Sequence, residues 1–500
     1  AKSNLSGISD IATPILSALA LRRFQRHALR TRLSANFACI HSQNMSTASS
    51  SKKRAASQLD GGEGPTSNKV PKVHPFFSKT KSPAVADLSG PLKWLTPLGT
   101  IGSCLHATHL EPTPSARIAA FDLDGTVIAS LPFSAPPLQW HWWNKCVPAK
   151  LTQVAEEGYS IVLISNQGGL KSASKANKWK EKLGLIAAAI PDVPFRLFAA
   201  TAKDRFRKPM IGMWEELERL YTADGVQIDK EGSFFVGDAA GRVHPNGKKK
   251  DFASTDRKWA LNVEIQFYTP EEYFLSQTPD TQFALHGFSV SSLPSALPLF
   301  APSSTPLLPD NPTQELVLFV GYPCLGKTTL FRKHFEPAGY IHINQDVLKT
   351  REKCVKAVDT ALAEGKKCVV DNTNRDASTR KYYIDAAKKR GVPVRCMVFT
   401  GSYDLAWHNN LYRAYGLPAS VISREVAPSA CACNPNLIHI EQPARELLPI
   451  GAFTTFRDKF EEPDLSEGFA HIISINWTFE GTDDEKKAWS RWLQLDDPKK

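Results

Sequence analysis

The chain has 500 residues, of which 42% are hydrophobic and 22% charged, and it carries a formal net charge of +11. This length and composition fit two folded domains with a tail, or three domains at most, and no apolar run is long enough to span a membrane, which argues against an integral membrane protein. The nine cysteines have no repeating spacing, which argues against a disulfide framework and favours a reducing compartment, while the excess of basic residues favours polyanionic partners.

Residues 1–90 are expected to be a disordered tail that includes a targeting segment. Within residues 1–44, arginines alternate with Leu, Phe and Ala, and Asp10 is the only acidic residue, which is the composition of a transit peptide. The alternative is an upstream extension, because Met45 could be an ordinary start. Residues 46–90 are rich in Ser, Lys, Gly and Pro, as disordered segments are, and residues 52–54 are a candidate nuclear import patch. We therefore expect the protein in the nucleus, with the mitochondrion as a second location.

Residues 91–285 are predicted to form an α/β domain with a doubly wound parallel sheet. Segments of helix length separate short apolar stretches that are typical of buried strands, at residues 118–121, 159–164, 195–199 and 233–236. The first stretch ends in Asp122 and Asp124, whose spacing lets both carboxylates point the same way. Because open α/β sheets bind ligands at the carboxyl ends of their strands, we predict a site here. The alternative is a strand followed by an Asp-rich turn.

Residues 286–314 separate this domain from the next. They contain six prolines, at positions 294, 298, 302, 306, 309 and 312, together with several serines. Such a composition is typical of a semi-rigid linker.

Residues 315–497 are predicted to form a second doubly wound parallel-sheet domain that binds ATP. An apolar strand at residues 315–320 leads into G-Y-P-C-L-G-K-T at residues 321–328, with a helical pattern after it. Strand and helix on the two sides of G-x-x-x-x-G-K-[ST] are the context that identifies a P-loop. Lys327 is expected to reach the β- and γ-phosphates and the Thr328 hydroxyl to bind Mg²⁺. The residues assigned to nucleotide binding are Gly321, Gly326, Lys327, Thr328, Thr329, Arg413 and Arg457.

Four residues are candidates for kinase chemistry in this domain. Asp346 could accept the proton of a hydroxyl substrate, although it could instead be the N-cap of the helix that follows. Arg413 and Arg457 could stabilise the transferring phosphoryl group, or they could be ordinary solvated arginines. Asp371, at the end of a predicted strand, could orient a metal ion.

The first domain resembles the haloacid dehalogenase phosphatases, whose motifs occur here in the family's order. The stretch F-D-L-D-G-T matches the first motif, which implies that Asp122 is a nucleophile and Asp124 a general acid and base. Ser165 matches the second motif, a hydroxyl that hydrogen-bonds the phosphoryl group. Lys208 matches the third, a lysine that stabilises the transferred charge, and Asp238 lies in the fourth.

The same resemblance implies a Mg²⁺ ion in the first domain. Its ligands would be Asp122, Asp238 and the backbone carbonyl of Asp124. The family usually adds a second acid after the fourth motif, which is either Asp251 or Asp256 in this sequence. We favour Asp256, because its context D-R-K-W-A-L-N reads as the start of a helix.

Taken together, the two domains resemble the eukaryotic polynucleotide kinase 3′-phosphatases over about residues 95–495. The matching stretches include S-N-Q, R-K-P and G-D-A-A-G-R in the first domain, and I-N-Q-D, V-V-D-N-T-N and H-N-N in the second. The resemblance implies hydrolysis of 3′-phosphates and ATP-dependent phosphorylation of 5′-hydroxyls, with Mg²⁺ and ATP as cofactors. Animal members carry a forkhead-associated domain, for which residues 45–90 are too short.

The resemblance also implies the partners of the protein. We expect it to act on DNA ends, single- or double-stranded, as a monomer that meets repair-complex proteins and no membrane. Two alternatives stay open from the sequence: a small-molecule phosphatase fused to a metabolite kinase, and an RNA end-healing enzyme.

Overall fold

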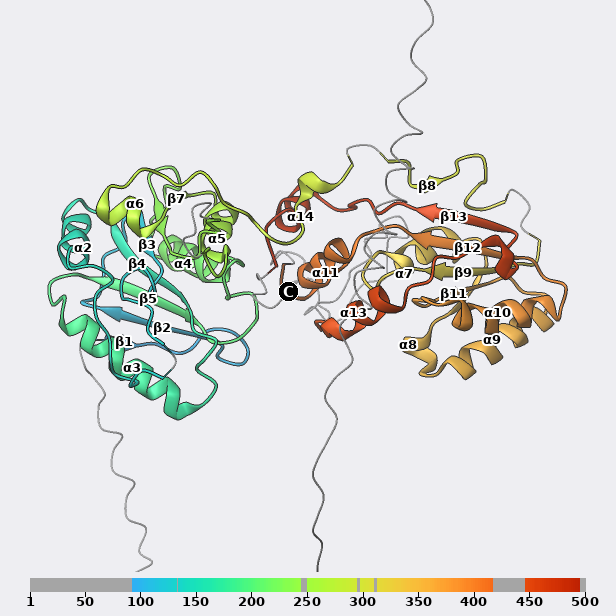
Figure 1. Ribbon diagram of the computed structural model, residues 1–500, viewed down its shortest axis with the longest axis horizontal. Coiled ribbons are helices and arrows are strands. Elements are labelled where there is room, and N and C mark those ends of the chain that lie inside the picture. Colours follow the sequence, from blue (N-terminus) through green and yellow to red (C-terminus); the bar gives the residue numbers. More distant parts are fainter. Residues whose placement is uncertain are drawn as a thin grey trace, which may run out of the picture. The chain divides into compact units, whose positions relative to one another are not determined.

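The computed structural model describes residues 92–494, except for residues 133, 244–249, 295–296, 310–312 and 417–445. The predicted tail and its targeting and nuclear import segments therefore lie outside the described residues. Two sheets organise the described chain (Figure 1). Among these residues no helix is both long and apolar enough to cross a membrane.

The first sheet has seven strands in the order β1-β2-β5-β4-β3-β6-β7. The strands are β1 (Leu92–Trp94), β2 (Cys104–His109), β3 (Ile118–Phe121), β4 (Ser160–Asn166), β5 (Phe195–Ala200), β6 (Phe234–Val236) and β7 (Gln266–Tyr268). Strands β3 to β7 are parallel, as predicted. The sheet is mixed, however, because β2 runs antiparallel to both β1 and β5.

Helices cover both faces of the first sheet because its strands are apolar on both sides. They are α2 (Val147–Glu156), α3 (Ala173–Ala188), α4 (Gly212–Ala223), α5 (Thr255–Val263) and α6 (Pro270–Leu275). Along β3, Ala119 and Phe121 pack in one core with residues of α2 and α3. Ile118 and Ala120 pack in a second core with residues of α4 and α5. This alternation follows from the period of two in a strand, and it confirms the doubly wound architecture.

The second sheet has six strands in the order β10-β11-β9-β12-β13-β8. The strands are β8 (Phe300–Ala301), β9 (Leu316–Val320), β10 (Ile341–Ile343), β11 (Cys368–Asp371), β12 (Val394–Phe399) and β13 (His471–Ile475). All neighbours are parallel except β8, which runs antiparallel to β13 at the edge.

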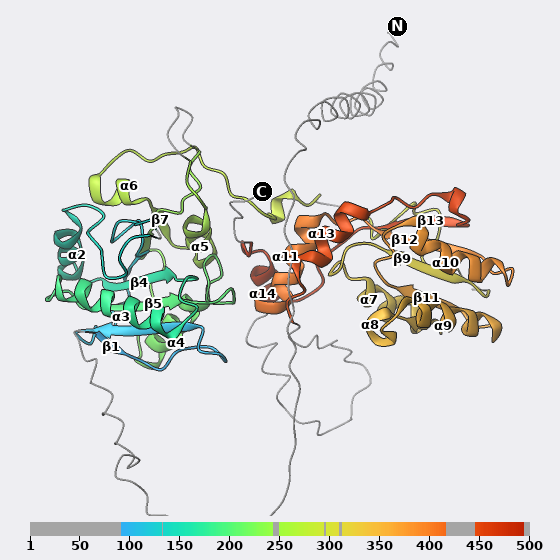
Figure 2. The same cartoon turned by 60° about the horizontal axis from the view of Figure 1, so that its bottom comes forward.

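Helices flank the second sheet as well. They are α7 (Lys327–Leu330), which continues as a π-helix at Phe331–Phe335, α8 (Gln345–Leu348), α9 (Arg351–Ala363), α10 (Ala377–Lys388), α11 (Tyr403–Leu411), α13 (Ile450–Lys459) and α14 (Asp483–Trp489). Helices α9 and α10 lie side by side (Figure 2) and pack on β9 through Leu316, Leu318 and Val320. The intervening residues Val317 and Phe319 pack on the other face, with α11 and α13.

The segment predicted as a linker, residues 286–314, departs from that expectation. Part of it belongs to the second domain: Phe288 and Leu307 are buried in the core around Phe319, and β8 extends the sheet. A proline-rich stretch can do this because an edge strand needs backbone donors on one side only. The predicted domain boundaries otherwise stay predictions.

Candidate active sites

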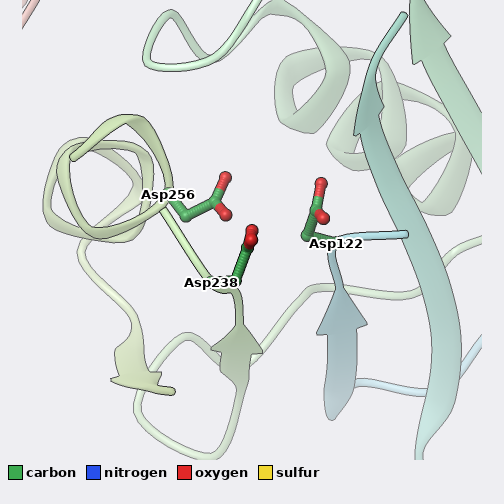
Figure 3. A group of neighbouring side chains, drawn as sticks. All are labelled: Asp122, Asp238 and Asp256. Carbon is green, nitrogen blue, oxygen red and sulfur yellow. The ribbon is translucent and has the colours of Figure 1, made fainter. Parts of the chain in front are cut away.

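Three carboxylates meet at the carboxyl ends of the strands in the first sheet. Asp122 directly follows β3, Asp238 follows β6 after one glycine, and Asp256 lies in the first turn of α5. One oxygen of each lies within 4.8 Å of the others, and Figure 3 shows the three carboxyl groups facing a common space. Gly237 allows this approach, because a Cβ atom there would lie 2.5 Å from Oδ2 of Asp256.

Lys208 is the one cation that contacts this group among the described residues. Its buried Nζ atom donates to Oδ1 of Asp122 at 2.6 Å, lies 2.8 Å from Oδ1 of Asp256, and donates to the carbonyl of Ile164 at 2.7 Å. Burial lowers the pKa of Lys208, but the two carboxylates outweigh burial and the net shift is upward. The lysine therefore stays charged.

The carboxylate group carries more negative charge than Lys208 can balance. Burial raises the pKa of Asp122 to about 7, against the opposing effect of Lys208. Burial and the neighbouring carboxylates of Asp122 and Asp256 raise the pKa of Asp238 well above its ordinary value. Clustered carboxylate oxygens are the donor type that Mg²⁺ prefers, and a divalent cation would relieve their repulsion. These residues therefore fit the predicted metal ion.

The structure distinguishes the two acids that the sequence left open. Asp256 lies in the group of three carboxylates. Oδ2 of Asp251 instead accepts hydrogen bonds from Nε of Arg242 at 2.9 Å and from the backbone N–H of Arg242 at 3.0 Å. This geometry favours Asp256 as the fourth acid, as proposed from its helical context.

Two polar side chains within the matched motifs, Gln167 and Arg207, have no role that the sequence predicts. Nε2 of Gln167 donates to Oδ2 of Asp124 at 2.6 Å and to Oγ of Ser165 at 3.0 Å, so it fixes both predicted residues. Arg207 precedes Lys208, and a Cβ atom at Gly168 would lie 2.9 Å from its Nη1. Nε and Nη1 of Arg207 are buried with no hydrogen-bond partner among the described residues. Only their positions inside S-N-Q and R-K-P could have pointed to them.

The predicted P-loop connects β9 to α7 in the second sheet. Gly321 is required because a Cβ atom there would lie 2.7 Å from Cβ of Phe399, and Gly326 has a φ of +83° in the left-handed region. Nζ of Lys327 donates to the carbonyls of Gly321 at 3.1 Å and Tyr322 at 2.6 Å. Burial lowers the pKa of Lys327. Phosphate oxygens could replace these two carbonyl acceptors and would hold the lysine charged.

Thr328 shares a polar cluster with Asp371 at the end of β11. Its Oγ1 donates to Oδ2 of Asp371 at 2.6 Å, and Nε2 of His342 lies 3.0 Å from the same oxygen. Nδ2 of Asn344 donates to the Asp371 carbonyl at 2.9 Å. Burial raises the pKa of Asp371, but the hydrogen bonds outweigh it and the net shift is downward. The ionised carboxylate therefore sits beside the hydroxyl predicted to bind Mg²⁺.

Lys327, Thr328, Asn344 and Asp371 line a cavity of about 1010 Å³ together with Thr329, Asp346 and Arg413. Asp346 lies in the first turn of α8, whose N-cap is Asn344, so the alternative that Asp346 is itself the cap is wrong. Arg457 is not among the lining residues. Its Nε donates to Asp458 at 2.9 Å and its guanidinium covers the Tyr403 ring.

The two halves of the chain match two family descriptions. "Polynucleotide kinase 3 phosphatase" matches residues 117–274, and "AAA domain" matches residues 316–427.

Individual relatives match either both halves or the first alone. The bifunctional polynucleotide phosphatase/kinase of Schizosaccharomyces pombe is 34% identical over 76% of this chain and 83% of its own length. A protein of Acanthamoeba polyphaga mimivirus with the same description, marked putative, is 30% identical over 75% of this chain and 88% of its own length. The polynucleotide 3′-phosphatase of Saccharomyces cerevisiae is 28% identical over 32% of this chain and 87% of its own length.

Proposed function

The chain belongs to the family of bifunctional polynucleotide phosphatase/kinases, and we propose that it removes 3′-phosphates from DNA ends and phosphorylates their 5′-hydroxyls with ATP. The observation that carries the proposal is that one chain holds two different groups of side chains that suit phosphate chemistry. The first has the carboxylates of Asp122 and Asp124 with the buried Lys208. The second has Lys327 and Thr328 on a P-loop. Together they would leave ends that a ligase can join.

In the first site, Asp122 attacks the phosphorus of the 3′-phosphate while Asp124 gives a proton to the departing 3′-oxygen. The resulting aspartyl-phosphate is hydrolysed by a water molecule whose proton Asp124 takes back, which regenerates both carboxyl groups. Lys208 and Ser165 contact the phosphoryl oxygens. A Mg²⁺ ion held by Asp122, Asp238, Asp256 and the carbonyl of Asp124 would offset the negative charge of the phosphate.

Gln167 and Arg207 support the same reaction. Because Gln167 donates to Asp124, it holds that carboxyl group in place for proton transfer. The guanidinium of Arg207 has buried donors with no partner among the described residues, and a phosphate of the substrate would supply acceptors for them. We therefore assign Arg207 to substrate binding.

In the second site, Asp346 accepts the proton of the 5′-hydroxyl as the hydroxyl oxygen attacks the γ-phosphorus of ATP, and ADP leaves as the bond from that phosphorus to the bridging oxygen breaks. Lys327 and Arg413 stabilise the charge on the transferring phosphoryl group. Thr328, beside Asp371, would hold a Mg²⁺ ion, which would offset the negative charge of the phosphates of ATP. Arg457 could join the site only after leaving Asp458, so its role stays a prediction.

The substrate class follows from the relatives and from charge. A net charge of +11 suits a polyanionic substrate. The comparisons do not favour a fused pair of small-molecule enzymes or an RNA end-healing enzyme. We propose a monomer that acts on single- or double-stranded DNA ends in the nucleus, and also in the mitochondrion, with repair-complex proteins as further partners.

The experiment compares five substrates with the full chain. A DNA oligonucleotide with a 3′-phosphate and a matched RNA should be tested beside a small phosphomonoester, and a 5′-hydroxyl oligonucleotide with ATP beside a small alcohol. The proposal predicts fast turnover of the two DNA substrates. Preference for the small substrates would contradict it, and preference for RNA would support an end-healing enzyme of RNA.

A further inference from the structure

The side chain of Asn262 joins the loop that follows Lys208 to the last described residues of the chain. Asn262 lies near the end of α5 and is 8% exposed. Its Nδ2 donates to the carbonyls of Pro209 at 2.8 Å and Trp492 at 2.7 Å, and its Oδ1 accepts from the backbone N–H of Trp492 at 2.7 Å. One buried amide thus connects the peptide next to Lys208 with the end of the second domain.

An apolar contact reinforces this connection one residue further on. Met210, Leu411 and Leu493 form a small buried cluster. Met210 belongs to the loop of Lys208, whereas Leu411 ends α11 and Leu493 follows α14. The second domain therefore packs directly against the residue two positions after the proposed catalytic lysine.

The same end of the chain also contacts α5, the helix that carries Asp256. Nζ of Lys258 is buried and donates to the carbonyls of His286 at 2.6 Å and Gln494 at 3.3 Å. The amide of Gln494 in turn accepts from the backbone N–H of Phe288 at 3.1 Å and donates to the carbonyl of Asp404 at 2.7 Å. Residues 491–494, which we call the C-terminal segment, thus hold α5 and the second domain together.

Lys208 needs a fixed backbone because its ammonium must meet two carboxylates at once. On one side, Asn166 accepts from the backbone N–H of Lys208 at 2.9 Å and donates to its carbonyl at 3.0 Å. On the other side, the fixing groups are Asn262 and the C-terminal segment. Small displacements of a group that contacts the reacting phosphate cost rate, even when the fold is intact.

We propose that Asn262 is a positioning residue for the phosphatase reaction: with the C-terminal segment of the kinase domain, it holds the loop of residues 208–210 so that Lys208 meets the phosphoryl group. The inference rests on the proposed function. It means that the phosphatase rate depends on residues at the far end of the chain, beyond the region that matches the phosphatase family.

The test is a double-mutant cycle in the full chain, with the 3′-phosphatase kcat and KM measured on an oligonucleotide. Asn262→Ala should lower kcat about tenfold and leave KM nearly unchanged. In the background of Lys208→Arg, Asn262→Ala should lower phosphatase kcat less than about twofold, because Asn262 acts through the lysine. Kinase activity and circular dichroism, measured on the same sample, give the fraction of folded protein.

Three further variants keep the test decisive. Leu493 contacts the loop from the second domain, so Leu493→Ala should also lower phosphatase kcat, while Leu493→Met should keep it near the unsubstituted value. This pair replaces Asn262→Ala if that variant does not fold. Lys487→Ala is the matched control, since it removes only an exposed ion pair with Glu264 at the same interface, and should change neither activity.

An equal loss in both lysine backgrounds, or no loss of phosphatase kcat relative to the control, would overturn the proposal. Absence of 3′-phosphatase activity in the unsubstituted chain would instead contradict the proposed function, so the two failures are distinguishable.

Discussion

The Nζ atom of Lys208 lies 2.6 Å from Oδ1 of Asp122, and the lysine side chain is only 1% exposed. Removing one partner of such a buried pair leaves the other charge uncompensated, at a cost of about 3–5 kcal/mol. In the proposed reaction it also removes a cation from the transferring phosphoryl group, and such a loss typically costs about 10²–10³ in rate.

Lys208→Met should therefore lose phosphatase activity by about two to three orders of magnitude and unfold at lower urea concentration, while the kinase rate is kept. Steady-state rates at saturating Mg²⁺ and urea titrations measure both effects. A variant within twofold of the unsubstituted rate would show that the ion pair has no part in the reaction.

Magnesium should stabilise the first domain through Asp256 and not through Asp251. A ligand that binds only the folded state at a concentration of 100 Kd adds about 2.7 kcal/mol to the free energy of unfolding. In thermal melts without ATP, Mg²⁺ should raise the melting temperature of the unsubstituted chain and of Asp251→Asn. The shift should be much smaller in Asp256→Asn. The opposite pattern would assign the fourth acid to Asp251.

His408 should make stability fall in mild acid. Its Nε2 bonds to the Trp489 carbonyl and its Nδ1 is buried without a partner among the described residues, and burial lowers its pKa to about 4 from 6.5. The unfolded chain takes up this proton as pH falls below 6.5, whereas the folded chain resists it until about pH 4. Neutral His408 therefore contributes its full stabilising effect above about pH 6.5, and this contribution is lost as the pH falls toward 4.

From these pKa values, the free energy of unfolding should be lower at pH 5 than at pH 7.5 by on the order of 2 kcal/mol. His408→Gln keeps a donor for the Trp489 carbonyl. In urea titrations at these two pH values, its free energy of unfolding should fall by a correspondingly smaller amount. An identical pH dependence in both proteins would exclude His408 as the source.

Cys324 in the P-loop should react faster than a core cysteine. Nη1 of Arg413 donates to its sulfur at 2.9 Å, and a neighbouring guanidinium favours the thiolate. Cys396 is fully buried, and burial raises its pKa to about 12. Iodoacetamide should modify Cys324 first and abolish kinase activity, ATP should slow the reaction, and Arg413→Ala should slow it too. Equal rates at the two cysteines, with no effect of ATP, would contradict this.

The positions of Asp122, Asp238 and the P-loop could be predicted because these residues follow a local pattern. Asp122 and Asp238 each end an apolar strand, and the P-loop lies between a strand and a helix, so the topology of a parallel sheet brings the members of each site together. The choice of Asp256 over Asp251 also followed from local sequence, since only the former starts a helix.

What could not be predicted depends on contacts between distant residues. No local signal says that β8 joins β13, that Gln167 reaches Asp124, or that Asn262 binds the backbone of Trp492. The antiparallel strands β1 and β2 also could not be predicted, because β1 has only three residues and the sequence of β2, C-L-H-A-T-H, lacks the run of apolar residues that marks a buried strand.

The central claim is that one chain holds two separate phosphate sites, and the most direct measurement assays two variants on both kinds of DNA end. Asp122→Asn keeps the shape of the nucleophile without its charge, and Lys327→Ala removes the P-loop cation. Each protein is given one oligonucleotide with a 3′-phosphate and one with a 5′-hydroxyl plus ATP, with circular dichroism as the folding control. We predict that Asp122→Asn loses only the phosphatase and Lys327→Ala only the kinase. Loss of both activities in either folded variant would contradict two separate sites.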